Sequence, residues 1–191
     1  GLGFGAIVGL CWIFLYVIQR KTIKVKKEVQ AQLNCEALGV IPEITFKKNS
    51  KNVDKNILFT NKGVSKGFME SFRVLRSVVI NSLKEDEKVV MVTSTAPGEG
   101  KTTIISNLAL ALGAYGKKVL LIDADLRNPS VAKLFKFDVD ALDYSIDTEK
   151  YRIARLKEHK ISFMHIKSDS NYHKFMNAKE IKSILNAVRD Q

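Results

Sequence analysis

The chain has 191 residues, enough for one domain with a sizeable core and an appendage. It carries 31 Lys and Arg side chains against 20 Asp and Glu, and this net charge of +11 calls for an anionic partner. Its two cysteines, Cys11 in an apolar run and Cys35 in a charged segment, exclude a disulfide scaffold, disfavour a metal pair and fit a reducing compartment.

The first 18 residues contain no charged side chain. As a helix they would cover roughly 27 Å at about 1.5 Å per residue, close to the hydrocarbon thickness of a bilayer. Trp12 and Tyr16 lie toward the end of the run, as aromatic residues at a membrane interface do. A basic cluster follows, and it marks the side of the membrane after the run as cytoplasmic. A signal peptide would have its basic residues before the apolar run. We therefore predict a transmembrane helix over residues 1–19, with a buried core helix as the alternative.

Residues 20–66 are predicted to form a basic juxtamembrane segment and linker. They hold eleven Lys and Arg against four Asp and Glu. Beside a membrane span, this charge favours contact with anionic lipids of the inner leaflet, worth about 1 kcal/mol per basic residue near the surface. A solvated linker is the alternative. No interleaved aromatic residues accompany the charge, so we expect no nucleic-acid partner.

A helical pattern begins at Gly67. Its apolar residues recur at three or four positions and predict a core-facing stripe: Phe68, Phe72, Leu75, Val79 and Leu83. Glu70, Arg73 and Arg76 follow one another at intervals of three and therefore share one flank of the helix. Geometry alone favours a solvated flank with one ion pair.

The stretch STAPGEGKTTIISNLALAL, residues 94–112, joins two apolar runs through two glycines and a lysine. The run before it, KVVMVT, predicts a buried strand, and the run after it predicts a helix. A strand, a glycine-rich turn and a helix form a phosphate-binding loop, because loop N–H groups and the helix N-terminus favour an anion there. The pattern matches G-x-x-x-x-G-K-[ST] except at its first position, where Thr95 stands.

In such a loop Lys101 can reach the β- and γ-phosphates of ATP, and the Thr102 hydroxyl can ligate Mg²⁺. At Gly98 and Gly100 a Cβ would block the phosphate or strain the turn. A tight turn with an exposed lysine is the alternative, which the strand and helix around the loop disfavour. The residues predicted to bind the nucleotide are Pro97, Gly98, Glu99, Gly100, Lys101, Thr102 and Thr103.

A second motif, VLLIDADLRNP, spans residues 119–129. Its apolar part predicts a buried strand, and Asp123 and Asp125 follow at the carboxyl end, where parallel α/β sheets bind ligands. If the strand ends at Asp123, the turn brings both carboxylates toward a Mg²⁺ ion, which prefers one or two such ligands. Either carboxylate could accept the proton of an attacking hydroxyl. A pair of turn-forming aspartates is the alternative.

These features occur in the order span, LGVIPE, ESFRVLR, TAPGEGKTT and LLIDADLRNP, and the match runs to about Leu134. In this order they resemble the bacterial tyrosine kinases (BY-kinases) of the capsule and exopolysaccharide co-polymerase family. The resemblance implies that Asp123 and Asp125, with Lys101, are catalytic and that both aspartates and Thr102 hold Mg²⁺. It also implies that the Glu70 flank joins kinase domains into a ring.

Two related classes fit less well. Division-site and plasmid-partition ATPases carry a lysine early in the phosphate loop, where this chain has Ala96. Iron–sulfur carriers have a paired cysteine motif after the loop, and this chain has none there.

Beyond Leu134 the chain departs from the kinase pattern, although ISFMHI predicts a strand and NAKEIKSILNAVR an amphipathic helix. His159, His165 and His173 show no spacing typical of ligands. The kinases continue into an apolar strand ending in aspartate and a tyrosine-rich tail. We therefore expect a piece truncated at both ends, or a degenerate copy.

The predicted fold is an α/β P-loop fold, a mainly parallel sheet with helices on both faces, plus the transmembrane helix. Residues 67–191 form its kinase domain, truncated at the C-terminus. The resemblance implies Mg²⁺-dependent transfer of the ATP γ-phosphoryl group to a tyrosine of a neighbouring copy, on the cytoplasmic side of the bacterial inner membrane. It also implies the polysaccharide assembly and export machinery as a partner. A non-catalytic, membrane-anchored nucleotide-binding regulator of polysaccharide export is the alternative.

Overall fold

The computed structural model describes residues 2–19, 29–30, 34–44, 57–61, 63–126, 128–167 and 178–189. Most of the predicted basic segment, and His173, lie outside these described residues. The chain divides into two compact units, residues 1–40 and 41–191. The domain boundaries predicted after residues 19 and 66 stay predictions.

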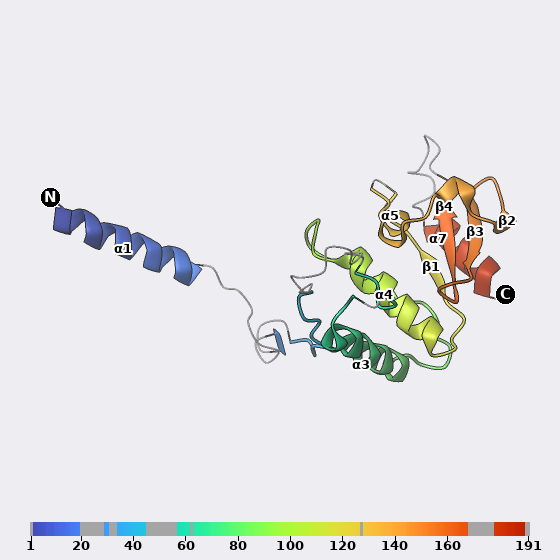
Figure 1. The fold of residues 1–191 in the computed structure, drawn as a ribbon, viewed down its shortest axis with the longest axis horizontal. Coiled ribbons are helices and arrows are strands. Elements are labelled where there is room, and N and C mark those ends of the chain that lie inside the picture. The colour runs from blue at the N-terminus through green and yellow to red at the C-terminus, as the bar shows by residue number, and fades with distance from the viewer. Residues whose placement is uncertain are drawn as a thin grey trace. The chain divides into compact units, whose positions relative to one another are not determined.

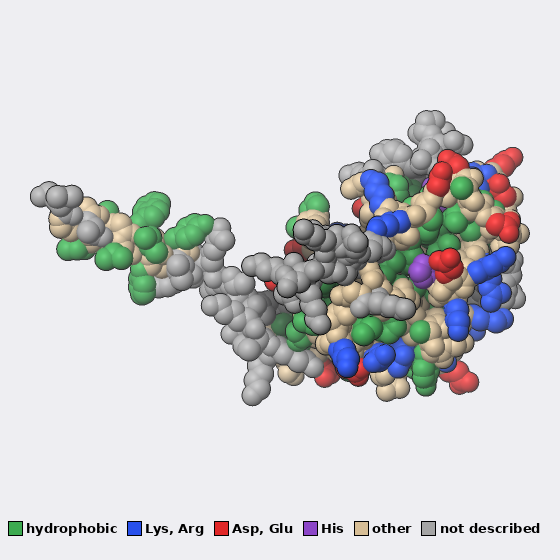
Figure 2. Space-filling view, in the orientation of Figure 1, with side chains coloured by type: hydrophobic (Ala, Val, Ile, Leu, Met, Phe, Trp, Pro, Cys, Tyr) green, Lys and Arg blue, Asp and Glu red, His purple; other side chains and the backbone are tan. Residues whose placement is uncertain are grey.

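The first unit contains α1 (Leu2–Gln19), a helix of 18 residues (Figure 1). Large apolar side chains are exposed along it, including Leu10, Trp12 and Phe14 (Figure 2). Across the described ranges, no helix meets the combined length and apolarity that crossing a bilayer requires. The transmembrane span stays a prediction.

The second unit is built on a four-stranded sheet with the order β1-β4-β3-β2. Its strands are β1 (Leu120–Ile122), β2 (Tyr144–Asp147), β3 (Tyr151–Leu156) and β4 (Ile161–Ile166). Strands β1 and β4 run parallel, whereas β4 with β3 and β3 with β2 run antiparallel. The prediction of a mainly parallel sheet is therefore wrong: the sheet is mixed.

Short turns explain the antiparallel pairs, because a parallel connection needs a crossover of a dozen or more residues. The hydroxyl of Thr148 closes the β2–β3 turn by donating to the Tyr151 carbonyl at 2.7 Å and accepting from the Tyr151 N–H at 3.0 Å. The β3–β4 turn ends at Lys160, whose φ of 58° reverses the chain. Both β2 and β3 lie in a stretch whose pattern predicted no strand.

The strand predicted just before the phosphate loop does not form. Residues 88–93 have no strand pairing, and Met91 and Val89 are 82% and 62% exposed. A groove of about 810 Å³ is lined by residues of this segment and of β1, which pairs with β4 alone. β-Branched residues favour a strand only where a neighbour completes the hydrogen-bond ladder, and within the described residues this segment has none.

The predicted helices are present. They are α3 (Lys66–Ser82), α4 (Lys101–Ala114) and α7 (Ala178–Arg189). Two short elements, α5 (Val131–Phe135) and the 3₁₀ turn η1 (Val139–Ala141), lie between β1 and β2. Helix α3 starts where the Ser65 side chain accepts a hydrogen bond from the Phe68 N–H, and it buries Phe68, Phe72 and Val79 of the predicted stripe.

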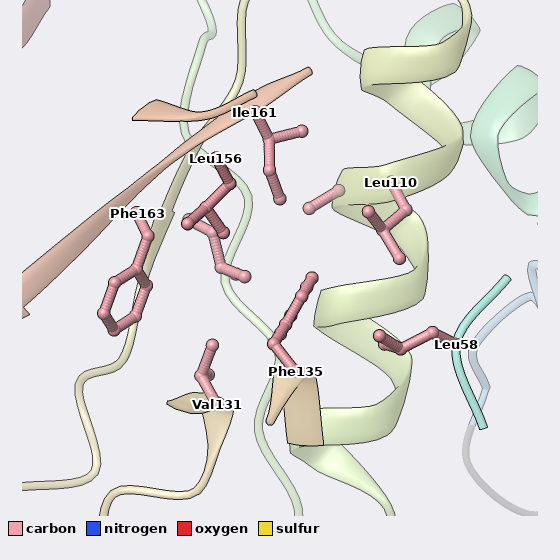
Figure 3. Close-up of a cluster of buried hydrophobic side chains, with 9 residues drawn as sticks. Leu58, Leu110, Val131, Phe135, Leu156, Ile161 and Phe163 are labelled. Carbon is pink, nitrogen blue, oxygen red and sulfur yellow. The ribbon is translucent and has the colours of Figure 1, made fainter. Parts of the chain in front are cut away.

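Helices cover both faces of the sheet, as predicted. On one face, Leu110 of α4 and Phe135 of α5 pack with Phe163 of β4 in a buried cluster (Figure 3). On the other face, Ile184 of α7 packs with Met164 of β4. Because neighbouring strand residues point to opposite faces, Phe163 and Met164 belong to different clusters. The phosphate loop and the end of β1 are thus held by a packed core.

Candidate nucleotide-binding site

The phosphate loop and the loop after β1 line one cavity of about 570 Å³. Six of the seven predicted nucleotide-binding residues line it, and Glu99 does not. The loop after β1 contributes Asp125, Asn128 and Ser130. The two loops come from different motifs of the sequence, and they meet at one place.

Backbone conformation explains the two glycines of the loop. Gly98 and Gly100 have φ of 81° and 87°, in the left-handed region. A Cβ at either position would meet no atom within 4 Å, so strain rather than crowding selects glycine within the protein itself. Gly100 caps α4 without a side-chain hydrogen bond, which leaves N–H groups of the first turn open to an anion.

The Lys101 side chain folds back over its own loop. Its Nζ donates to Ser94 Oγ at 2.8 Å and to the Ala96 carbonyl at 3.2 Å. A phosphate group in the cavity would compete with these two neutral acceptors, because the ammonium is attracted more strongly to an anionic oxygen than to an uncharged one. The ammonium is thus held beside the cavity by contacts that it can exchange.

Glu99 closes the loop from outside the cavity. Its carboxylate accepts from the Ala96 N–H at 3.0 Å and from the Thr95 hydroxyl at 3.3 Å. The hydrogen bond from Ala96 is the main cause that lowers the pKa of this carboxyl below its ordinary value. Thr95, the residue that departs from the motif, therefore helps to fix the loop.

The two aspartates have different surroundings. Asp123 Oδ2 accepts from the N–H groups of Ser130 at 2.9 Å and Val131 at 3.0 Å, and its Oδ1 accepts from the Asp125 N–H at 3.2 Å. Asp125 is exposed, lines the cavity, and accepts from the Asn128 N–H at 3.1 Å. Asp123 thus closes the loop, while the Asp125 carboxylate faces the cavity.

A hydroxyl pair joins the two loops: Thr102 Oγ1 and Ser130 Oγ lie 2.7 Å apart. No group of three His, Cys, Asp or Glu side chains within the described residues could hold a metal ion alone. Among the described residues that line the cavity, Asp125 carries the one carboxylate, and five carry a hydroxyl, Thr102 among them. This donor set fits Mg²⁺, which binds through one or two protein ligands together with phosphates and water.

The predicted interface flank is also in place on α3. Arg73 Nη1 and Glu70 Oε2 form an exposed ion pair at 3.0 Å, worth a few tenths of a kcal/mol. The guanidinium of Arg73 lies 5.9 Å from the centre of the Phe59 ring, and that of Arg76 lies 4.5 Å from the centre of the Tyr115 ring. Aromatic rings from other segments therefore orient both arginines.

Five residues that line the cavity were not predicted as site residues: Ser94, Thr95, Ala96, Asn128 and Ser130. Two of them, Ser94 and Ser130, are serines whose hydroxyl contacts a predicted site residue, Lys101 or Thr102. The only available signal was position, since each lies at the edge of a recognised motif.

Comparison with known proteins defines the class. The family model described as "ParA: NUBPL iron-transfer P-loop NTPase" matches residues 85–181, just over half of the chain. The chain belongs to this family of P-loop NTPases. The matched range contains no cysteine.

Among individual proteins, the chain is 49% identical over 67 residues to the tyrosine-protein kinase YwqD of Bacillus subtilis (strain 168), covering 35% of this chain and 28% of that protein. It is 26% identical over 153 residues to the succinoglycan biosynthesis transport protein ExoP of Rhizobium meliloti (strain 1021), covering 68% of this chain and 20% of that protein. The chain thus spans less than a third of the length of these relatives. The predicted resemblance to bacterial tyrosine kinases is confirmed.

A solved structure shows the same fold. The kinase domain of the Escherichia coli tyrosine kinase ETK superposes with a TM-score of 0.68 at 20% identity, covering 88% of this chain and 70% of that one.

Proposed function

We propose that the chain is part of an ATP-dependent protein-tyrosine kinase that regulates capsule or exopolysaccharide assembly and export. One observation carries the proposal: the loop of Lys101 and the loop of Asp125 line the same cavity. Similarity to YwqD, named a tyrosine-protein kinase, supports tyrosine as the acceptor. Similarity to ExoP, named a biosynthesis transport protein for succinoglycan, supports the polysaccharide context.

In this reaction Lys101 exchanges Ser94 and Ala96 for the β- and γ-phosphates, and loop N–H groups hold the remaining phosphate oxygens. Thr102 and Asp125 are the residues that would hold Mg²⁺, which would supply neutralisation of the charge on those oxygens. Asp125, which lines the cavity, would accept the proton of the tyrosine hydroxyl. Asp123 already accepts three backbone hydrogen bonds, so the remaining lone pair of its Oδ1 is what it would offer to the metal.

The proposal includes the surroundings of the enzyme. Glu70, Arg73 and Arg76 would contact a neighbouring copy in a ring, with exposure of the Glu70–Arg73 pair in support. Residues 1–19 would anchor the chain in the bacterial inner membrane, supported by the exposed apolar side chains of α1, and residues 20–66 would meet anionic lipids. Deletion of residues 1–19 should then abolish carbonate-resistant membrane association.

A second candidate, the non-catalytic nucleotide-binding regulator, is favoured by the state of Asp123. Three backbone N–H groups take up most of the accepting capacity of its carboxylate, so Asp125 would carry the larger part of both the metal binding and the proton transfer. One experiment separates the two functions. The longer protein of which the chain is proposed to be part is incubated with Mg²⁺ and ATP labelled at the γ-phosphate, and labelled phosphotyrosine is measured.

A kinase labels tyrosine, and Asp125→Asn should lower that labelling by at least about 100-fold, since charge stabilisation and proton transfer are both affected. Nucleotide binding without labelling would support the regulator instead. Equal labelling by wild type and Asp125→Asn would contradict the assignment of Asp125.

A further inference from the structure

Ser130 stands between the two halves of the nucleotide site. Its hydroxyl is 2.7 Å from Thr102 Oγ1, and its backbone N–H donates to Asp123 at 2.9 Å. It is partly buried and lines the cavity. It is also the N-cap residue of α5, and the N–H of Val131, the first residue of that helix, donates to Asp123 as well. Asp123 therefore holds the backbone of Ser130, and the Ser130 side chain contacts Thr102.

The direction of the proton between the two hydroxyls decides what Thr102 can do. A hydroxyl has one proton and two lone pairs. If Thr102 donates to Ser130, the proton of Thr102 is held in that bond and both of its lone pairs are free for a cation. If no acceptor stood there, the Thr102 hydroxyl could rotate and direct its proton into the cavity.

We propose that Ser130 is a positioning residue: it accepts the Thr102 proton and fixes the Thr102 oxygen toward the Mg²⁺ of bound Mg·ATP. Outer-shell partners of this kind act through the ligand that they orient, and their removal costs about 10- to 100-fold in metal affinity. Asp123 belongs to the same arrangement, because its carboxylate sets where Ser130 lies. The inference rests on the proposed nucleotide site and adds residues that orient its metal ligand.

The test measures ATP affinity by calorimetry in the 191-residue chain, in mild detergent, once with Mg²⁺ and once with EDTA. The variants are Ser130→Ala, which removes the acceptor, and Ser130→Thr, which restores a hydroxyl. Ser82→Ala is the matched control, because among the described residues its exposed hydroxyl donates to the Val78 carbonyl of its own helix and to no other group. Circular dichroism checks that every variant has the wild-type thermal midpoint.

In wild type, Mg²⁺ should strengthen ATP binding. Ser130→Ala should reduce that strengthening by about 10-fold or more while the affinity in EDTA changes less than about twofold. Ser130→Thr and Ser82→Ala should retain the wild-type effect of Mg²⁺.

The inference is overturned if Ser130→Ala keeps the full effect of Mg²⁺, or if it weakens binding equally with Mg²⁺ and with EDTA. It is also overturned if ATP binds wild type equally well in both conditions. A different result, wild type that binds no ATP in either condition, rejects the nucleotide site itself and thereby the proposed function.

Discussion

Asn107 of α4 offers the sharpest test of how residues 57–59 are attached to helix α4. Its side chain is fully buried. The amide nitrogen donates to the Ile57 carbonyl at 2.9 Å and to the Thr103 carbonyl at 2.8 Å, and the amide oxygen accepts from the Phe59 N–H. Leu58, between the two bonded residues, is 3% exposed in the core. One side chain thus fastens residues 57–59 to the helix that carries the phosphate loop.

Asn107→Ala removes all three hydrogen bonds. At about 1 kcal/mol net for each bond, and more for a buried group left unpaired, the free energy of unfolding should fall by about 3 kcal/mol. The amide of Phe59 loses its acceptor, so its protection from hydrogen exchange should drop by about 100-fold. Urea unfolding followed by circular dichroism measures the first effect, and hydrogen exchange measures the second.

The matched control is Asn81→Ala, at an exposed position of α3, which should change stability by less than about 0.5 kcal/mol. The reasoning is refuted if Asn107→Ala costs less than about 1 kcal/mol, or if the exchange of the Phe59 amide stays at its wild-type rate.

Three further predictions concern stability. Burial lowers the pKa of His159 below its ordinary 6.5. The unfolded chain therefore protonates this histidine at a higher pH than the folded chain does, and the free energy of unfolding falls as the pH drops below about 6.5. His159→Leu should therefore lose less stability than wild type between pH 7.5 and 5.5 in urea titrations; equal losses would exclude this histidine as the cause. Gly113→Ala should cost about 1–3 kcal/mol, because the new Cβ would lie 2.7 Å from Ile161 Cγ2, and an unchanged thermal midpoint would show that the contact relaxes freely. Gly67→Ala, a helical position with no atom within 4 Å of the new Cβ, should stabilise by about 0.5–1 kcal/mol, and a lower midpoint would contradict this.

Local patterns were enough to predict much of the fold. The periodicity of residues 67–83 fixes both α3 and the side of it that is buried, and the apolar runs at 119–122 and 161–166 became β1 and β4. The strand predictions that failed concern segments whose pairing depends on residues far away in the sequence. Residues 88–93 have strand-forming side chains but no neighbouring strand among the described residues, and the β3 strand forms by pairing with β4 and β2.

In the site, too, contiguous motifs were predictable from the sequence and contacts between distant residues were not. The position of six loop residues at the cavity was predictable because they belong to a contiguous motif, although Glu99 of the same motif does not line the cavity. The contact between Thr102 and Ser130 joins residues 28 positions apart, and spacing could not reveal it. Sequence also left Asp123 and Asp125 equivalent. The turn after β1 separates them, because it directs backbone N–H groups at Asp123 and leaves Asp125 at the cavity.

The most direct test of the account is the affinity of the chain for Mg·ATP, measured by calorimetry in wild type and in Lys101→Ala. Lys101 is the cationic side chain that lines the cavity within the described residues, and its neutral partners can be exchanged for phosphate. The account predicts saturable binding to wild type and no measurable binding to a folded Lys101→Ala variant. Equal affinity of the two proteins for Mg·ATP would contradict it.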